Sequence, residues 1–309
     1  MYDMIILGGG AAGLAAAAYA QSKQLDVLVI ADETGGKAGT QQHLLNQPGD
    51  EELLGADVVQ LLARRVAARA GTLLHDRAIG VAKLRGTFQV ETQHHGTLQA
   101  QVVLVATGAV PLPLDVPGAQ NLINHGIGYS ITTHAHLLPD KTAAVIGTTS
   151  RALRGAVELA NCGAQVYLIA PDATGMTTPL AQVLRHTAGV TVFERYQVKQ
   201  IVGDTNVEHM VIERDNEQSY LRVDAVFADL GLLPNSGVVR RIAQVDADGF
   251  LLIDEQLMTT LPGLFAAGDV TTAFAENILV AIGAGTRAAI SAHEYLLART
   301  PFYAVEPAE

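Results

Sequence analysis

Three glycines near the start of the chain, Gly8, Gly10 and Gly13, have the spacing G-x-G-x-x-G. The apolar run 2–7 before them predicts a buried strand, and the Ala-rich segment 14–20 after them predicts a helix. In that setting the first glycine permits a tight turn, the second lets a pyrophosphate approach the backbone, and the third lets helix and strand pack closely. The helix N-terminus adds N–H groups and a positive dipole end. The pattern predicts a dinucleotide site.

A second apolar run, 25–31, ends beside Asp32 and Glu33. A carboxylate at this point can accept hydrogen bonds from the ribose hydroxyls of an adenosine. A glycine motif alone is a weak signal, but a strand, a helix, a second strand and an acid in this order make it specific.

Composition favours a protein of more than one domain. The chain has 309 residues, of which 49% are hydrophobic and 17% charged, and it includes 30 glycines. These values suit an α/β fold with buried parallel strands. A net charge of −11 argues against a nucleic-acid or anionic-membrane surface. No apolar run approaches the roughly 20 residues of a membrane span, and the first residues lack the basic region of a signal peptide. We therefore expect a cytoplasmic protein.

The chain divides into three stretches with two expected crossovers. We expect a helix over 51–70, a small antiparallel insertion over 80–100 and a buried strand over 102–106, followed by a Pro-rich passage at 111–118. A second nucleotide-type unit follows, with a strand at 142–146, a turn at 147–150, a helix at 151–161 and a strand at 165–169. A long helix over 277–298 ends the last stretch. The expected boundaries are 1–113 and 239–309 for one discontinuous domain and 114–238 for the other.

Four short motifs carry a family resemblance: the opening GGGAAG, Ala106-Thr107-Gly108, Gly268-Asp269, and Asn46-Gln-Pro-Gly. In their order and spacing the chain resembles the low-molecular-weight thioredoxin reductases. The resemblance implies an α/β fold of two Rossmann-like, three-layer ββα domains. It also implies one FAD per chain, bound by the discontinuous domain, and a homodimer.

The resemblance also implies roles for individual positions. Glu33 would face the adenosine ribose, and Asp269 the ribityl chain. Glu276-Asn277-Ile278 occupies the family's Arg-Gln-Ala position, where backbone N–H groups and the helix dipole favour negative charge on the N1/O2 edge of reduced flavin. Asn277 could instead be only a helix N-cap. The full set of implied FAD-binding positions is Gly8, Gly10, Ala12, Gly13, Glu33, Asn46, Ala106, Thr107, Gly108, Gly268, Asp269, Asn277 and Ile278.

The chain departs from the family where the redox-active thiols should be. Ser130 and Thr133 stand at the two Cys-x-x-Cys positions, and Cys162 is the only cysteine. A hydroxyl offers no thiolate near neutral pH and forms no disulfide. Dithiol exchange within this chain is therefore excluded, and Cys162 is interpreted as a small core thiol.

The turn that begins at Gly147, in the second nucleotide-type unit, also departs from the family pattern. Thr149 replaces the middle glycine of the turn that begins at Gly147, so a β-branched side chain obstructs the approach of a pyrophosphate. The following strand ends at Asp172 with no arginine, which argues against NADPH because a carboxylate repels its 2′-phosphate. NADH remains an alternative, since Asp172 could accept from its ribose, but Thr149 favours a degenerate site.

Other polar and aromatic residues leave alternatives open. His134 stands at the family's acidic position and is a candidate proton donor to reduced flavin. It lies near His125 and His136, but their spacing is loose and we predict no metal site. Phe302 or Tyr303 could stack on the flavin ring, or the tail could simply be frayed.

These observations predict an FAD-dependent oxidoreductase without a redox-active disulfide. Electrons would pass directly between the flavin and a ferredoxin-like or flavodoxin-like protein or a small molecule. Two alternatives remain, a non-enzymatic FAD-binding redox sensor and an NADH-dependent flavin oxidase.

Overall fold

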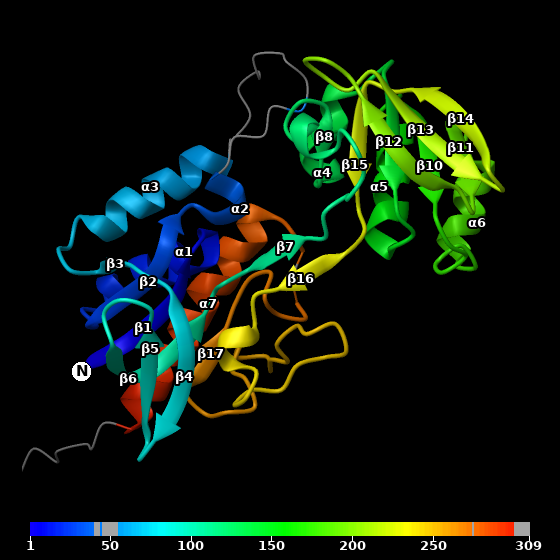
Figure 1. Cartoon of the computed structure of the whole chain (residues 1–309). Coiled ribbons are helices and arrows are strands. Elements are labelled where there is room, and N and C mark those ends of the chain that lie inside the picture. Colours follow the sequence, from blue (N-terminus) through cyan, green and yellow to red (C-terminus); the bar gives the residue numbers. More distant parts are fainter. Residues whose placement is uncertain (40–43, 45–54, 274, 300–309) are drawn as a thin grey trace, which may run out of the picture. The chain divides into compact units, whose positions relative to one another are not determined.

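A computed structural model of the protein describes residues 1–39, 44, 55–273 and 275–299. They divide into two compact units (Figure 1). Unit 1 takes its residues from 1–39, 55–110 and 233–299, and unit 2 from 111–232 together with Leu44. The chain passes from unit 1 to unit 2 through β7 (Ala109–Pro111) and returns through β16 (Leu232–Pro234), and these two short strands pair with each other.

Unit 1 is built on a seven-stranded sheet. Five strands pair in parallel, in the order β3 (Leu73–His75), β2 (Val27–Thr34), β1 (Tyr2–Gly9), β6 (Thr97–Val105) and β17 (Leu264–Ala266). Two antiparallel strands, β5 (Thr87–Thr92) and β4 (Ala78–Leu84), extend the sheet from β6. The sequence predicts that a separate strand begins at residue 102, and this start is wrong. Residues 97–105 form one continuous strand, β6. Its first half pairs with β5, and its second half pairs with the parallel strands β1 and β17.

Two hydrophobic cores lie on opposite faces of this sheet. Alternate residues of β1 point into them, with Met4 and Ile6 in one core and Ile5 and Leu7 in the other. The first core is shared with α1 (Ala11–Ser22), α3 (Gly55–Ala67) and α7 (Ile278–Arg299). Of the helix expected over 51–70, residues 55–67 are helical and 51–54 lie outside the described residues. The unit thus has helices on one face and mainly strands and loops on the other.

Unit 2 repeats this three-layer plan. Its parallel sheet has the order β11 (Val190–Glu194), β10 (Gln165–Ala170), β9 (Thr142–Ile146), β15 (Ala225–Ala228) and β8 (Ile127–Gly128). Helices α4 (Ile131–His134), α5 (Ser150–Asn161) and α6 (Pro179–His186) share one core with it. The antiparallel sheet of β12 (Gln197–Val202), β13 (His209–Arg214) and β14 (Glu217–Arg222) shares the core on the other face. The strand, turn, helix and strand expected over 142–169 are confirmed.

The remaining elements are short. They are α2 (Gly36–Gly39) and the 3₁₀ turns η1 (Gln120–Leu122), η2 (Ala135–Leu137) and η3 (Gly237–Val239). Within the described residues, no helix combines the length and apolar character needed to cross a bilayer.

Candidate functional site

Two of the three motif glycines in the turn of unit 1, Gly8 and Gly13, are required for steric reasons. Gly8 has a φ of +110°, and a Cβ there would lie 2.3 Å from the carbonyl oxygen of Ala106. A Cβ on Gly13 would lie 2.0 Å from the carbonyl oxygen of Gly8. Both positions therefore exclude any side chain, because Gly8 is in contact with the backbone that follows β6, and Gly13 with the backbone of Gly8.

Gly10 differs from the other two. No described atom lies within 4 Å of a Cβ built on it, and its φ of −81° is open to any residue. Gly10 is also the N-cap of α1, and no side chain caps this helix end. The fold has no internal need for glycine at this position, so the space beside Gly10 is where a pyrophosphate can approach the first N–H groups of α1.

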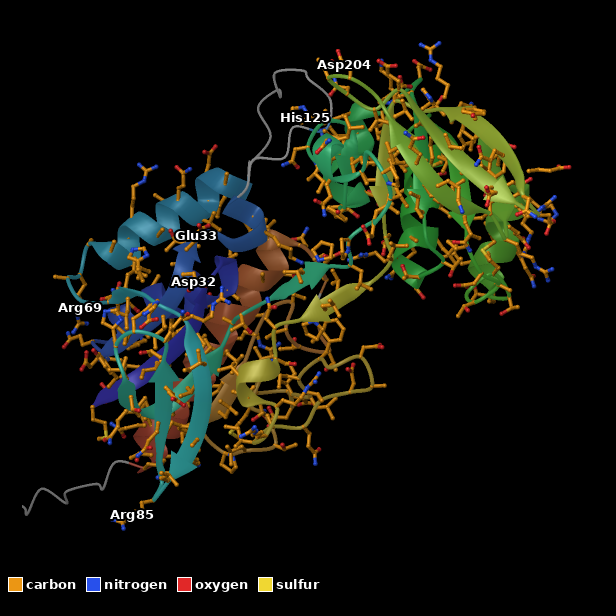
Figure 2. All side chains as sticks on the ribbon, in the orientation of Figure 1. Asp32, Glu33, Arg69, Arg85, His125 and Asp204 are labelled. Carbon is orange, nitrogen blue, oxygen red and sulfur yellow. The ribbon has the colours of Figure 1, made fainter. Side chains whose placement is uncertain are left out.

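Two acids follow one another at the carboxyl end of β2 (Figure 2). The Asp32 carboxylate is paired with the guanidinium of Arg77, with the Nε atom of Arg77 2.8 Å from Oδ2 of Asp32. Glu33 is exposed. Of the two acids, Glu33 is therefore the better candidate for the adenosine ribose, because Asp32 is already engaged.

A buried carboxylate anchors the segment that carries Arg77. Asp76 accepts the backbone N–H groups of Arg77, His94 and His95, and the Nδ1 atom of His95 lies 2.6 Å from its Oδ2. Burial opposes ionisation, but the hydrogen bonds from the His95 ring, these backbone groups and Thr92 outweigh it and hold the pKa of Asp76 well below its usual range.

The segment Ala106–Thr107–Gly108 is clamped by a residue that sequence reasoning did not single out. The side-chain amide of Asn235 donates to the carbonyl of Thr107 over 2.9 Å, and the Thr107 hydroxyl donates to the carbonyl of Asn235 over 2.8 Å. The Asn235 backbone N–H donates to Gly108. An asparagine directly after the Pro234 that ends β16 was the available signal for this turn partner.

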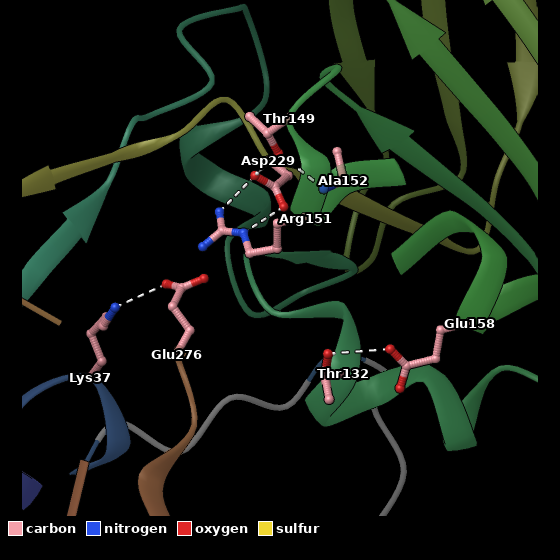
Figure 3. A network of polar contacts seen from close by, with 8 residues as sticks. All are labelled: Lys37, Thr132, Thr149, Arg151, Ala152, Glu158, Asp229 and Glu276. Carbon is pink, nitrogen blue, oxygen red and sulfur yellow. Dashed lines mark hydrogen bonds and ion pairs between the residues drawn. The ribbon is translucent and has the colours of Figure 1, made fainter. Parts of the chain in front are cut away.

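Gly268 and Asp269 lie where β17 ends and face the N-terminal end of α1. A Cβ on Gly268, whose φ is +76°, would lie 3.1 Å from the Cβ of Ala12. The Asp269 carboxylate lies 2.8 Å from the ammonium of Lys37. The same ammonium lies 3.0 Å from the carboxylate of Glu276, and Figure 3 shows this second contact. Sequence reasoning missed Lys37, whose one signal is its place directly after Gly35 and Gly36.

The side chain of Asn277 caps α7. Its Oδ1 accepts the backbone N–H groups of Leu279, over 2.9 Å, and Val280, over 3.3 Å. The N-cap alternative is therefore correct for this side chain. Ile278 packs against the core that α1 and α7 share.

The corresponding turn of unit 2 is closed by its own side chains (Figure 3). The Thr149 hydroxyl accepts the N–H of Ala152 as the N-cap of α5 and donates to Oδ1 of Asp229, both over 3.0 Å. Arg151 binds the same buried carboxylate with two hydrogen bonds, from Nε over 2.6 Å and from Nη2 over 2.7 Å. Thr149, Arg151 and Asp229 thus bind one another beside the start of α5.

A loop also packs against this turn. Gly175 contacts Thr148 so closely that a Cβ on it would lie 2.1 Å from the carbonyl oxygen of Thr148. Oδ1 of Asp172 accepts the backbone N–H of Thr174 over 2.7 Å. The acid that could hold an NADH ribose is therefore part of the loop that covers the turn.

Ser130 is the N-cap of the short helix α4, and His134 is its last residue. His134 is 4% exposed and packs against Phe227, and its Nδ1 donates to the carbonyl of Ser130 over 2.8 Å. Cys162 is half-buried beside the helical core of unit 2. Asn46, Phe302 and Tyr303 lie outside the described residues. Among the residues the structure does describe, no three His, Cys, Asp or Glu side chains are grouped to hold a metal ion.

A family model described as pyridine nucleotide-disulphide oxidoreductase matches residues 2–290. The chain belongs to this family. Curated relatives include the F subunit of alkyl hydroperoxide reductase from Staphylococcus epidermidis, 28% identical over 300 residues, and from Staphylococcus aureus, 29% identical over 300 residues. The matches cover 96% of this chain but 59% of those proteins. The chain therefore spans well under two thirds of the length of these relatives.

Solved structures show the same fold. The thioredoxin reductase of Streptococcus pyogenes superimposes with a TM-score of 0.85 at 25% identity, covering 96% of this chain and 99% of that one. The thioredoxin reductase of Giardia duodenalis gives 0.85 at 22% identity, covering 96% and 99%. The predicted thioredoxin reductase-like α/β fold is confirmed. Membership of the family implies a flavin oxidoreductase.

Proposed function

We propose that this chain is an FAD-dependent oxidoreductase that passes electrons directly between its flavin and an external partner. The observation that carries the proposal is the glycine turn of unit 1. Gly8 and Gly13 are fixed by backbone contacts, whereas Gly10 faces open space at the uncapped start of α1. This is the arrangement that a dinucleotide pyrophosphate requires.

Other residues of unit 1 would hold the rest of FAD. Glu33 would accept from the adenosine ribose, and Asp269 from a ribityl hydroxyl. The Ala106–Gly108 segment, clamped by Asn235, would line the site with its backbone. When bound, the flavin supplies the electron-accepting and electron-donating chemistry, and the chain binds it and sets its electrostatic surroundings.

Direct transfer follows from the chemistry of the chain. Ser130 offers a hydroxyl where a thiol would be needed, and Cys162 has no second cysteine with which to form an intramolecular disulfide. Electrons must therefore leave or reach the flavin without a dithiol relay in this chain. His134 remains a candidate proton donor, with its Nδ1 proton held by Ser130.

The donor or acceptor is, in our proposal, a ferredoxin-like or flavodoxin-like protein or a small molecule. Thr149 caps α5, Arg151 and Asp229 are paired, and Gly175 abuts the turn, so the contacts within unit 2 argue against NADPH and NADH. The NADH oxidase alternative requires Asp172, whose Oδ1 already accepts the N–H of Thr174. From the family resemblance we also propose a homodimer in the cytoplasm.

The test is anaerobic reduction of the purified protein, followed by the visible absorption band of oxidised flavin. We expect the purified protein to carry FAD and dithionite to bleach its absorption band. Reduced ferredoxin or flavodoxin should also bleach the band when it is mixed with the protein. NADPH and NADH should leave it oxidised. Protein that stays colourless after incubation with FAD, or a flavin band that NADH bleaches within seconds, would contradict the proposal.

A further inference from the structure

One cation in unit 1 contacts two carboxylates from segments far apart in the sequence. The ammonium of Lys37 lies 2.8 Å from Oδ2 of Asp269 and 3.0 Å from Oε1 of Glu276. The two acidic side chains are mostly buried, at 14% and 12% exposure, and the lysine side chain is 36% exposed. Two carboxylates that share one ammonium lie close to each other and repel when the cation is removed.

Backbone contacts place Lys37 at the glycine turn. The N–H of Gly35 donates to the carbonyl of Gly9 over 2.8 Å, and a Cβ on Gly36 would lie 3.3 Å from the Cα of Gly10. The Lys37 side chain therefore runs from the turn that faces the pyrophosphate space to the Gly268–Asp269 segment. FAD bound at the glycine turn would therefore have the Lys37 side chain beside it.

The backbone conformation of Glu276 is a second observation, independent of the distances, that the contacts around Lys37 constrain this segment. Glu276 has a φ of +46°, a left-handed conformation that non-glycine residues adopt rarely and that surrounding contacts must hold. Its ion pair with Lys37 is one such contact. A residue held in a disfavoured conformation directly before the N-cap of α7 indicates a constraint at this point beyond helix formation.

We propose that Lys37 is the charge-balancing residue of the FAD site. The inference rests on the proposed function, because it assumes that FAD binds at the glycine turn. A pyrophosphate brings negative charge into a site that already contains Asp269 and Glu276. The ammonium of Lys37 orients both carboxylates, so that Asp269 can accept a hydroxyl, and it reduces the repulsion between these carboxylates and the phosphates. Lys37 is thus a further binding residue for the cofactor.

The experiment measures the dissociation constant of FAD on full-length apoprotein, from the quenching of flavin fluorescence, at low and high salt. We expect Lys37→Met to weaken FAD binding about tenfold to hundredfold, the cost of losing a charged hydrogen-bonding partner. Lys37→Arg should keep most of the affinity. Lys23→Met, which removes an exposed lysine of unit 1 and changes the net charge equally, should bind FAD like the wild type.

A double variant separates charge balance from a structural role. If Lys37 balances charge, Glu276→Gln alone should bind FAD at least as tightly as the wild type, and Lys37→Met with Glu276→Gln should recover part of the lost affinity. A purely structural contact would lower the melting temperature of both single variants and show no recovery.

The outcomes distinguish this inference from the function it rests on. Wild-type protein that does not bind FAD overturns both. Wild-type protein that binds FAD, with Lys37→Met binding equally well or the double variant showing no recovery, overturns the role of Lys37 and leaves the flavoprotein proposal in place.

Discussion

The two units of this chain contain the same strand–turn–helix–strand sequence of elements, yet their turns differ in what satisfies the helix N-terminus. In unit 1 the N-cap of α1 is Gly10, which has no side chain to offer, and no described atom fills the space beside it. In unit 2 the N-cap of α5 is Thr149, whose hydroxyl accepts a backbone N–H, and Arg151 and Asp229 pair next to it. The start of α1 has no side-chain cap, whereas the start of α5 is capped by Thr149.

The difference concerns how the N–H groups at the start of each helix find partners. An isolated helix end leaves N–H groups without partners, and these need a side chain, water or an anion. Unit 2 retains its parallel sheet and buried core with a capped, closed turn. The same order of elements therefore folds with either kind of turn.

The largest effect on stability should come from adding a methyl group at Gly13, where the backbone of α1 contacts the backbone of Gly8. Gly13→Ala would place a Cβ 2.0 Å from the carbonyl oxygen of Gly8, which only backbone movement can relieve. We expect a loss of more than about 4 kcal/mol in the free energy of unfolding. Gly10→Ala is the matched control and should change stability by less than about 1 kcal/mol. Denaturant unfolding checks both, and equal losses would contradict the assigned steric roles.

In unit 2 the corresponding weak point is an ion pair rather than a glycine. Arg151→Met should cost about 3 kcal/mol, because it leaves the buried carboxylate of Asp229 without its bidentate partner. Arg154→Met, on the exposed side of the same helix, should change stability by about 0.5 kcal/mol or less. The midpoints of chemical unfolding measure the difference. Similar midpoints for the two variants would show that the pair does not hold the turn closed.

Asp76 of unit 1 should make a smaller contribution to stability, and this contribution should depend on pH. The pKa of Asp76 is lowered in the folded protein, so its ionised form stabilises the fold above the ordinary value of 3.8, and this stability is lost as the pH falls below that value. Asp76→Asn should be less stable than the wild type near neutral pH and should lose less further stability on acidification. Melting temperatures between pH 6 and pH 3 test this. Parallel curves for the two proteins would contradict it.

The periodic and glycine-bounded elements were predictable from sequence because their signals are local. The strand before Gly8, the unit at 142–169 and the C-terminal helix all follow from short apolar runs and their turns. The extent of β6 was not predictable, because a strand that serves two pairings has no internal break to read. The roles of Lys37 and Asn235 were not predictable for a similar reason. Their partners lie far away in the sequence, and nothing in the local pattern indicates the ion pairs of Lys37 or the hydrogen bonds of Asn235.

The most direct test of the difference between the two turns is the amount of FAD that remains bound per chain after gel filtration of the wild type and of Gly10→Val. Valine fits the backbone at this position and meets no described atom within 4 Å of its Cβ, so the variant should fold. We predict one FAD per wild-type chain and none on folded Gly10→Val, because the side chain fills the pyrophosphate space. A folded Gly10→Val protein that retains FAD, or a wild-type chain that retains two dinucleotides, would contradict this assignment.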